Sequence, residues 1–390
     1  MINLAGGAAC LIVWLYLLVG RGRFWRAEEL FEAVGLDIER RREGPWPSVT
    51  AIVPARDEAG VIGQAIASLN RQAYAGRFAI VVVDDQSSDG TALAARRAAG
   101  ADRRLSIVEG RSPPPGWSGK VWAMQQGVAA AEAAPQPPDY LLFVDADIIL
   151  WGGLLRRLVA VAEAKHATLA SLMVKLRRES PAEHWLAPAF VFFFQMLYPF
   201  AWVNDPGRRT AAAAGGCMLV PRQSLAEVGG LAAVRGALID DCALAALMKR
   251  RGRVWLGLTQ EALSLRAYPT FADFGRMVAR SAFAELRFSA LRLIIAEVAM
   301  GFVFLAPPLL AVFSRGAPQA LGAAAWAIMA LLLAPTLRLY GRPAFSGLAL
   351  PAIAAAYMLF TVQSAAQYWT GRGGLWKGRV HAPMAKAERV

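Results

Sequence analysis

From about residue 48 onward the chain alternates between short apolar runs and segments with helical periodicity. Each of the first three apolar runs, which have the length of a strand, precedes a segment with helical character. These runs are Val49–Val53, Phe78–Val83 and Leu105–Val108, and a fourth, Tyr140–Val144, follows them. Strands that alternate with helices are typical of βαβ units, so the pattern predicts an α/β fold with a mostly parallel sheet flanked by helices.

Two carboxylates, Asp145 and Asp147, directly follow the fourth apolar run. A run this apolar is typical of a strand buried on both faces, and ligands of parallel sheets bind outside the carboxyl ends of the strands. Two hard oxygen ligands at such a place suit Mg²⁺ or Mn²⁺. An Asp-rich turn explains the pair equally well when it is considered alone.

Further acids follow the first two runs. They are Asp57 and Glu58 after the first run, and Asp84 and Asp85 after the second. On a parallel sheet all these pairs would share one rim with Asp145, although each pair alone is also compatible with turns or helix caps. Neither a Gly-x-Gly-x-x-Gly pattern nor a P-loop is present, which disfavours a Rossmann dehydrogenase and a P-loop kinase.

The segment after residue 180 contains three further candidates. Trp185–Val203 is aromatic and apolar but carries two prolines, so we expect an interfacial segment, with a buried core helix as the alternative. Ala211–Arg222 is a small-residue loop that enters a strand, where glycine permits either close approach to a ligand or a tight turn. Asp240 and Asp241 begin an amphipathic helix; capping accounts for one carboxylate, and the second indicates a functional role.

The two ends of the chain carry long apolar segments. Leu4–Gly20 is followed, not preceded, by arginines, which predicts an uncleaved anchor with the N-terminus outside and the next domain cytoplasmic. Leu293–Phe313, Ala320–Leu337 and Gly347–Gln363 are each close to the roughly 20 residues that cross a bilayer. Four crossings would leave the basic tail outside, against the positive-inside rule, unless Leu293–Phe313, which contains Glu297 and two prolines, is re-entrant.

Composition supports a membrane protein. The chain is 56% hydrophobic and carries a net charge of +13, which fits a basic face toward anionic lipid. Nucleic acid is the other usual partner of a basic chain, but no zinc-finger, homeodomain or RNP pattern occurs, so we expect no nucleic-acid partner. The three cysteines show neither a disulfide framework nor metal-ligand spacing, and no protein partner is indicated.

The order of the motifs resembles the family 2 glycosyltransferases, which have the GT-A fold. The resemblance spans about residues 48 to 290 and rests on the following motifs: Val53-Pro-Ala-Arg-Asp-Glu58, Val83-Asp-Asp-Gln-Ser-Ser-Asp-Gly-Thr91, Gly116-Trp-Ser-Gly-Lys120, Asp145-Ala-Asp147 and Asp240-Asp241. With its membrane segments the chain looks most like the hopene-associated glycosyltransferases, and ceramide glucosyltransferases are more distant. Their late (Gln/Arg)-x-x-Arg-Trp motif is reduced to Met277-Val-Ala-Arg280-Ser281, which counts against processive synthesis and against ceramide as acceptor.

The resemblance implies a role for each matched residue. Asp145 and Asp147 would hold a divalent metal, Mn²⁺ or Mg²⁺, at the diphosphate, and Asp241, beside Asp240, would act as the general base on the acceptor hydroxyl. Lys120 and Arg280 would contact the diphosphate, with a surface lysine and a membrane-surface arginine as the competing explanations. The remaining donor-binding residues implied are Pro54, Arg56, Asp57, Glu58, Asp84 and Asp85, the last two reading the uracil ring.

The expected activity is therefore inverting, metal-dependent transfer of a hexose from a nucleotide sugar, expected to be a UDP-sugar, to the hydroxyl of a membrane lipid such as a hopanoid. We expect a multi-pass protein of a bacterial-type inner membrane whose catalytic domain faces the cytoplasm. The expected parts are an anchor (1–21), a linker helix (22–47), the catalytic domain (48–270), an interfacial segment (271–292), transmembrane helices (293–367) and a basic tail (368–390). A sugar-nucleotidyltransferase would need neither Asp240-Asp241 nor the apolar segments, and a degenerate transporter or scaffold would not retain intact acids.

Overall fold

The computed structural model describes residues 2–373, 375–376 and 379–380. The chain forms two compact units, each assembled from separate stretches. The helical unit consists of Met1–Glu28, Arg178–Ala201 and Ala267–Gly374, and the sheet unit of Glu29–Arg177, Trp202–Arg266 and Leu375–Val390. The stretch expected as one catalytic domain, residues 48–270, is thus interrupted by a segment that belongs to the helical unit.

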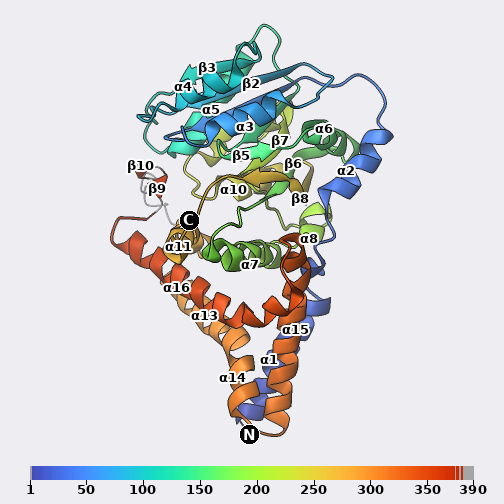
Figure 1. The fold of residues 1–390 in the computed structure, drawn as a ribbon, viewed down its shortest axis with the longest axis vertical. Coiled ribbons are helices and arrows are strands. Elements are labelled where there is room, and N and C mark those ends of the chain that lie inside the picture. The colour runs from blue at the N-terminus through green and yellow to red at the C-terminus, as the bar shows by residue number, and fades with distance from the viewer. Residues whose placement is uncertain (1, 374, 377–378, 381–390) are drawn as a thin grey trace. The chain divides into compact units, whose positions relative to one another are not determined.

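The sheet unit is built on one mixed sheet of eight strands in the order β3-β2-β1-β4-β7-β6-β8-β5 (Figure 1). The strands are β1 (Val49–Ala55), β2 (Phe78–Asp84), β3 (Leu105–Glu109), β4 (Tyr140–Val144), β5 (Ile148–Leu150), β6 (Ala167–Lys175), β7 (Cys217–Pro221) and β8 (Arg253–Ser264). The first four pair in parallel, as the alternating pattern predicts. Strand β7 is antiparallel to both β4 and β6, and β5 is antiparallel to β8. Two further short strands, β9 (Leu375–Trp376) and β10 (Arg379–Val380), pair with each other.

Helices cover both faces of this sheet. They are α2 (Phe31–Arg40), α3 (Ile62–Asn70), α4 (Thr91–Ala99), α5 (Gly119–Glu132), α6 (Leu154–Ala164), α9 (Arg222–Glu227) and α10 (Asp240–Lys249), with a 3₁₀ turn at Leu231–Val234. Because β2 and β3 extend the sheet on one side of β1 and β4 on the other, right-handed crossovers place α3 and α4 on one face and α5 on the opposite face. Helix α5 packs closely on the sheet, since a Cβ at Gly127 would lie 2.4 Å from Ile52 Cγ2.

Strand register determines where the acids lie. Val49 pairs with Phe78 and Ala55 with Asp84, so β1 and β2 end side by side at their carboxyl ends. Strand β4 begins beside β1, with Tyr140 opposite Val49, and ends at Val144. The strand-end acids predicted from the sequence therefore lie along one rim of the sheet.

The helical unit consists almost entirely of helices. They are α1 (Ile2–Val19), a 3₁₀ turn (Phe24–Arg26), α7 (Pro181–Leu197), α11 (Phe271–Ala279), α12 (Ala282–Glu285), α13 (Ala290–Met300), a π-helical turn (Gly301–Leu305), α14 (Ala306–Phe313), α15 (Ala317–Leu339), a 3₁₀ turn (Ala344–Ala349) and α16 (Leu350–Trp369). A short helix, α8 (Phe200–Asn204), lies where the chain passes from this unit back to the sheet unit.

Three of these helical stretches are long and apolar enough to cross a membrane: Ala290–Phe313, Ala317–Leu339 and Ala344–Trp369. Each contains one of the three segments predicted from hydropathy. Pro307 and Pro308 do not end the first stretch, because a π-helical turn precedes them and the helix continues to Phe313. Helix α1 is apolar but shorter than these three.

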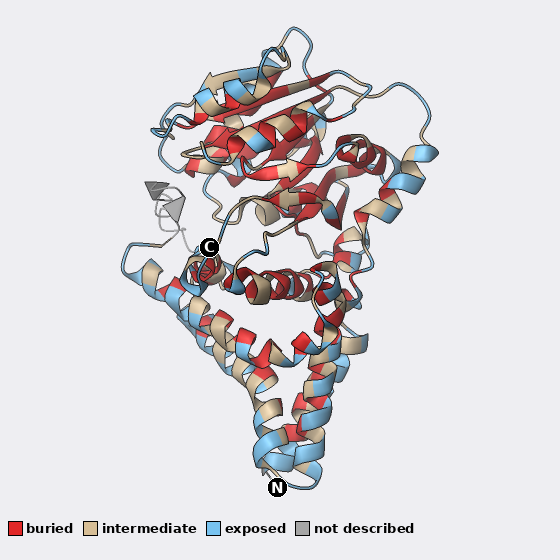
Figure 2. Cartoon of the chain, viewed as in Figure 1, coloured by how far each residue is buried: buried red, intermediate tan, exposed pale blue. Residues whose placement is uncertain are grey.

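Helix α7 is a buried helix of this unit, as the alternative interpretation of Trp185–Val203 expected. Most of its residues are buried although Pro188 lies inside it (Figure 2). Its start is fixed by a capping box in which Ser180 and Glu183 bond reciprocally to the backbone. The buried carboxylate of Glu183 also accepts from Tyr268 N, which ties α7 to the segment before α11.

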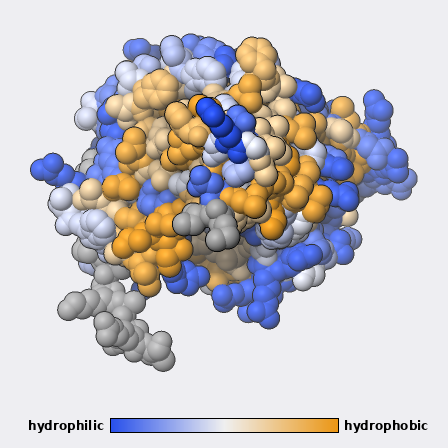
Figure 3. Space-filling view, turned by 90° about the horizontal axis from the view of Figure 1, so that it is seen from below, coloured by the Kyte–Doolittle hydropathy of each residue, from blue (hydrophilic) through white to orange (hydrophobic). Residues whose placement is uncertain are grey.

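Exposed large apolar side chains gather on the helical unit. Ile12, Ile294, Val298 and Phe313 are each more than half exposed. Seen from below, broad hydrophobic patches are visible on the surface (Figure 3). A protein in water rarely exposes this much contiguous apolar surface, so these helices have the surface expected for contact with lipid.

Candidate active site

The loops after β1 and β2 are bonded to each other at the rim of the sheet. Arg56 donates from Nη1 to the carbonyl oxygen of Asp85, and its guanidinium lies 3.7 Å from the Asp85 carboxylate. The Asp85 side chain is fully buried. Asp57, which has a positive φ of 51°, accepts at Oδ1 from Ser88 N at 2.9 Å, and Asp84 accepts from Ser87 N at 3.0 Å. The two predicted donor-binding loops are thus joined by hydrogen bonds and by an ion pair.

Beside these loops a chain of charged contacts joins three strand ends. Glu58, after β1, forms an ion pair with Arg266, which follows β8. The Arg266 Nε lies 3.7 Å from Asp147 Oδ2, and the same carboxylate oxygen accepts from Ser264 Oγ at 2.6 Å. Glu58 and Asp147 are both mostly buried, with exposed side-chain fractions of 11% and 10%.

Lys120 lies close to Asp145, Asp240 and Asp241. It is the second residue of α5, whose N-terminus is fixed by Ser118, a side chain that accepts from Val121 N. Its ammonium group is 2.7 Å from Asp145 Oδ1. Burial acts to lower the pKa of Lys120, but the charges of Asp145, Asp240 and Asp241 outweigh it and raise this pKa above the usual range. Lys120 is therefore a cation of the site.

Asp241 is held by backbone amides. Its Oδ2 accepts from Gly215 N at 2.7 Å and its Oδ1 from Cys242 N at 2.8 Å. Gly215 belongs to the small-residue loop before β7, and the neighbouring Ala214 is in turn fixed by Ser171 Oγ on β6. A Cβ at Gly215 would lie 3.0 Å from Asp241 Oδ2 and 3.4 Å from Lys120 Nζ, so glycine allows this close approach.

Burial and like charge make Asp241 a stronger base than an ordinary aspartate. Burial, followed by the neighbouring charge of Asp240, raises the pKa of Asp241 to about 6, although Lys120 opposes the shift. Burial also raises the pKa of Asp145, against the charge of Lys120. The Oδ2 of Asp240 is buried without a hydrogen-bond partner in the described part of the chain. Such a group is costly unless a ligand satisfies it.

The acids fit a divalent metal of the kind the sequence predicts. Within the described residues no group of three or more His, Cys, Asp or Glu side chains is arranged to hold a metal ion. Mg²⁺, however, usually takes only one or two protein carboxylates and completes its shell with water and substrate phosphates. Asp145 and Asp147, one residue apart at the end of β4, meet that requirement.

Two predicted donor-binding residues do not belong to the strand-end loops of the sheet unit. Pro54 is buried inside β1, opposite Val83, where it belongs to the strand itself. Arg280 is the C-terminal cap residue of α11 in the helical unit. The other ten predicted residues all belong to the sheet unit and lie at its strand ends or at the starts of α5 and α10.

Ser264, Arg266 and Gly215 were not among the predicted site residues. The first two follow the apolar run of β8 and bond to Asp147 and Glu58. The strand-end argument that found Asp145 could have found them, but no motif marks them. Gly215 lies in the small-residue loop Ala211–Arg222, where the sequence indicated either close approach to a ligand or a tight turn, and its amide donates to Asp241.

A family profile described as "Glycosyltransferase like family 2" matches residues 47–263, more than half of the chain. The chain therefore belongs to glycosyltransferase family 2, and it is an enzyme of that class with the GT-A fold. This confirms the family and the fold expected from the motifs.

The relatives found by sequence are two N-acetylglucosaminyltransferases. One, from Mesorhizobium japonicum, is 28% identical over 146 residues, which is 36% of this chain and 31% of the relative. The other, from Rhizobium leguminosarum bv. viciae, is 46% identical over 67 residues, 17% of this chain and 15% of the relative. The matches thus span less than a third of either relative.

One solved structure is similar over nearly the whole chain. It is a mannosyltransferase from Pyrobaculum calidifontis in complex with GDP-Man and Mn²⁺, with a TM-score of 0.51 and 18% identity. The match covers 90% of this chain and 98% of that one. At this identity the similarity supports the fold alone.

Proposed function

We propose that the protein transfers a sugar, with inversion, from a nucleoside diphosphate donor to the hydroxyl group of a membrane lipid. The observation that carries the proposal is the cluster of Lys120, Asp145, Asp147 and Asp241 at the carboxyl end of β4 and the start of α10. In this cluster Asp145 and Asp147 can hold a metal at the diphosphate, and Lys120 adds a positive charge beside them. Asp241 is a buried base whose pKa is raised. Family membership supports a nucleotide-sugar donor.

Asp241 is the proposed base. Its carboxylate, fixed by two amide donors, takes the proton of the acceptor hydroxyl while the oxygen attacks the anomeric carbon. The new bond forms between acceptor oxygen and anomeric carbon, and the bond to the β-phosphate oxygen breaks, so the nucleoside diphosphate leaves with the electron pair. Direct displacement from the opposite face inverts the configuration.

Asp145 and Asp147 are the residues that would hold Mn²⁺ or Mg²⁺, which when bound neutralises charge on the departing diphosphate. Lys120 neutralises further charge at the same place and orients Asp145. Arg56 supports the loop after β2, where Asp84 and Asp85 are proposed to face the base of the nucleotide. Contact of Arg280 with the diphosphate is proposed from the resemblance to the family 2 motif.

The lipid acceptor is proposed from the helical unit, in which three helices are long and apolar enough to cross a membrane. We further propose an inner-membrane location with the catalytic unit facing the cytoplasm. A UDP-sugar is the proposed donor. UDP-N-acetylglucosamine should be tested first, because the sequence relatives are N-acetylglucosaminyltransferases. A hopanoid is one acceptor within the proposed class.

The test uses the full chain in nanodiscs with Mn²⁺ or Mg²⁺, a panel of UDP-sugars with GDP-mannose for comparison, and a mixed bacterial lipid extract. We expect nucleoside diphosphate release that depends on metal and on lipid, and a new glycolipid by mass spectrometry. Asp147→Ala should abolish both signals. Asp102→Ala, at the amino end of β3, is the matched control and should leave them unchanged. If the folded protein releases nucleoside diphosphate but no glycolipid forms, the proposal that the acceptor is a lipid is wrong.

A further inference from the structure

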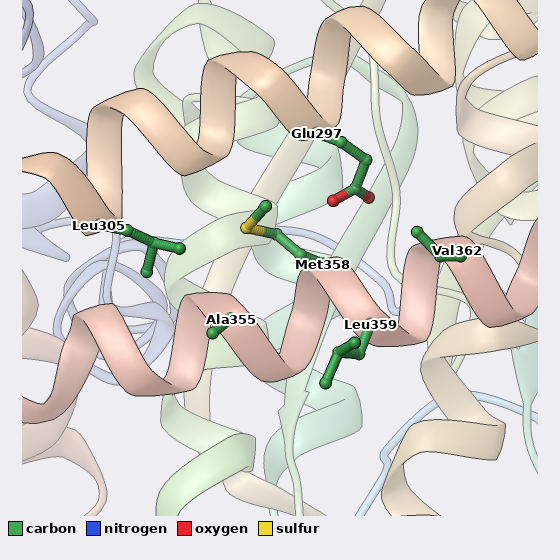
Figure 4. Close-up of a pocket in the computed structure, with 6 residues that line it drawn as sticks. All are labelled: Glu297, Leu305, Ala355, Met358, Leu359 and Val362. Carbon is green, nitrogen blue, oxygen red and sulfur yellow. The ribbon is translucent and has the colours of Figure 1, made fainter.

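A pocket of about 290 Å³ lies within the helical unit, between α13 with its π-helical turn and α16 (Figure 4). Glu297 and Leu305 project into it from the first helix, and Met358 enters from α16. The remaining lining residues are Ala355, Leu359 and Val362, so five of the six side chains are apolar. The volume is near the lower limit of ordinary ligand pockets, which suits one polar group and an adjoining stretch of hydrocarbon.

Glu297 is the polar group of this pocket, and it is not satisfied by the protein. Its Oε1 is buried and has no hydrogen-bond partner within the described residues. An unsatisfied buried oxygen destabilises the protein, and a charged one does so more strongly. An ionisable side chain in a membrane helix marks a functional site unless a partner explains it. The Glu297 carboxyl is thus an acceptor that lacks a donor.

The depth of Glu297 along the helix limits which chemical group can donate a hydrogen bond to it. It lies seven residues after Ala290, the first residue of α13, or about 10 Å along the helix axis. Its neighbours Ile294, Ile295 and Val298 are each more than half exposed and apolar, as expected for residues that face lipid chains. A strongly hydrated ammonium or phosphate head group stays at the interface, whereas a single hydroxyl on an otherwise apolar molecule can reach this depth.

We propose that this pocket binds a membrane lipid alcohol whose hydroxyl donates a hydrogen bond to Glu297. The hydrocarbon next to the hydroxyl lies against Met358, Leu359 and Val362 on α16. This binding is independent of the proposed sugar transfer, because none of these residues belongs to the candidate active site.

The experiment uses photoaffinity labelling of the full chain in nanodiscs. The probe is a diacylglycerol with a diazirine on one acyl chain, and the matched probe is its methyl ether, in which a methyl group replaces the donor hydrogen. Labelled peptides are mapped by mass spectrometry. We expect the alcohol to label residues 290–313 and 350–369 roughly three- to tenfold more than the ether does, the effect of one buried hydrogen bond in a membrane protein.

Four variants test the assignment. Glu297→Leu should reduce labelling by the alcohol to the level of the ether, whereas Glu297→Gln, which keeps an acceptor oxygen, should retain most of it. Met358→Trp should fill the pocket and suppress both probes. Val298→Leu, on the exposed face of the same helix, is the control and should change nothing. Each variant is first checked for folding by gel filtration.

Three outcomes would overturn the proposal. Equal labelling by alcohol and ether would mean that the carboxyl does not select the hydroxyl. Labelling spread evenly over all exposed helix surfaces would indicate bulk lipid only. Stronger labelling by an ethanolamine phospholipid carrying the same diazirine chain would assign the pocket to a cationic head group.

Discussion

Lys120 offsets the charge of three carboxylates that would otherwise repel one another. Asp145 is 2.7 Å from its ammonium group, and Asp240 and Asp241 are close enough to raise its pKa. Without this cation the acids would tend to take up protons, since like charges in a partly buried site disfavour ionisation. A single lysine thus favours the ionised form of both Asp145, a proposed metal ligand, and Asp241, the proposed base.

Replacing Asp241 by Asn should abolish transfer. Asn keeps the side-chain size but cannot accept the acceptor's proton, so we expect a loss of roughly 10²–10⁴-fold in kcat/KM. The measurement is the initial rate of diphosphate release by the purified variant. If Asn at this position leaves the rate near the wild-type value, another group is the base.

The dependence of kcat/KM on pH should follow the ionisation of Asp241. Because the pKa of Asp241 is raised to about 6, its carboxylate is ionised at pH 7 and becomes protonated as the pH falls through 6. We therefore expect kcat/KM to fall about tenfold per pH unit below pH 6 and to be flat just above neutrality. An acid limb near pH 4 would contradict the shifted pKa.

Gly215→Ala should impair activity with little unfolding. The new Cβ would crowd Asp241 Oδ2 and Lys120 Nζ, which must shift by a few tenths of an ångström. Because the proposed base is displaced, we expect a decrease in kcat of about tenfold, which corresponds to about 1.4 kcal/mol of lost transition-state stabilisation. Gly152→Ala, where a Cβ meets nothing within 4 Å, is the control for the substitution itself.

Among the elements, the connection from β5 to α6 is held by side chains from the end of α3 and just after it, where Ser68 Oγ accepts from Leu150 N. Gln72, just after α3, is buried and donates to the carbonyls of Leu150 and Trp151, while its Oε1 accepts from Leu155 N. It therefore fixes residues 150–155, which follow Asp147 and β5. Gln72 supplies hydrogen-bond partners for backbone groups that would otherwise lack them.

Gln72→Leu should destabilise the protein without removing apolar volume. Unpaired backbone groups cost about 1–3 kcal/mol each, so we expect a thermal midpoint lower by roughly 5–15 °C. Tryptophan fluorescence on heating measures it. Gln64→Leu, exposed on the same helix, should shift the midpoint by less than about 2 °C, as surface substitutions do. Equal shifts would mean that the hydrogen bonds contribute little.

Local pattern predicted the elements better than it predicted their partners. The limits of β4, Tyr140–Val144, follow from the apolar run alone, and the strand-end rule placed Asp145 and Asp147 correctly. The antiparallel pairing of β7 and the assignment of α7 to the helical unit depend on contacts between distant parts of the sequence. The contacts of Ser264 and Arg266 with Asp147 and Glu58 are of the same kind: the strand-end rule could have pointed to the two residues, but not to these partners.

At the scale of the whole molecule, the exposed apolar surface of the helical unit should determine how the protein is extracted. We expect the full chain to remain in the membrane pellet after washing with alkaline carbonate and to be released only by detergent, because several long apolar helices hold it in lipid. Immunoblotting of the fractions measures this. Release by carbonate would show that the helices lie on the surface and do not cross the bilayer.

The contacts of α1 also have a consequence for the order of events during synthesis. Trp14 Nε1 donates to the carbonyl of Val303, which is 289 residues later in the chain, and α1 packs on α14 and α15. At roughly 5–20 residues per second, the ribosome needs about 15–60 s to make that partner. For this interval the first helix exists without the helices that cover it, and all eight strands of the large sheet are synthesised in the meantime. The cell must therefore shelter α1, in lipid or in the insertion machinery, until the last third of the protein arrives.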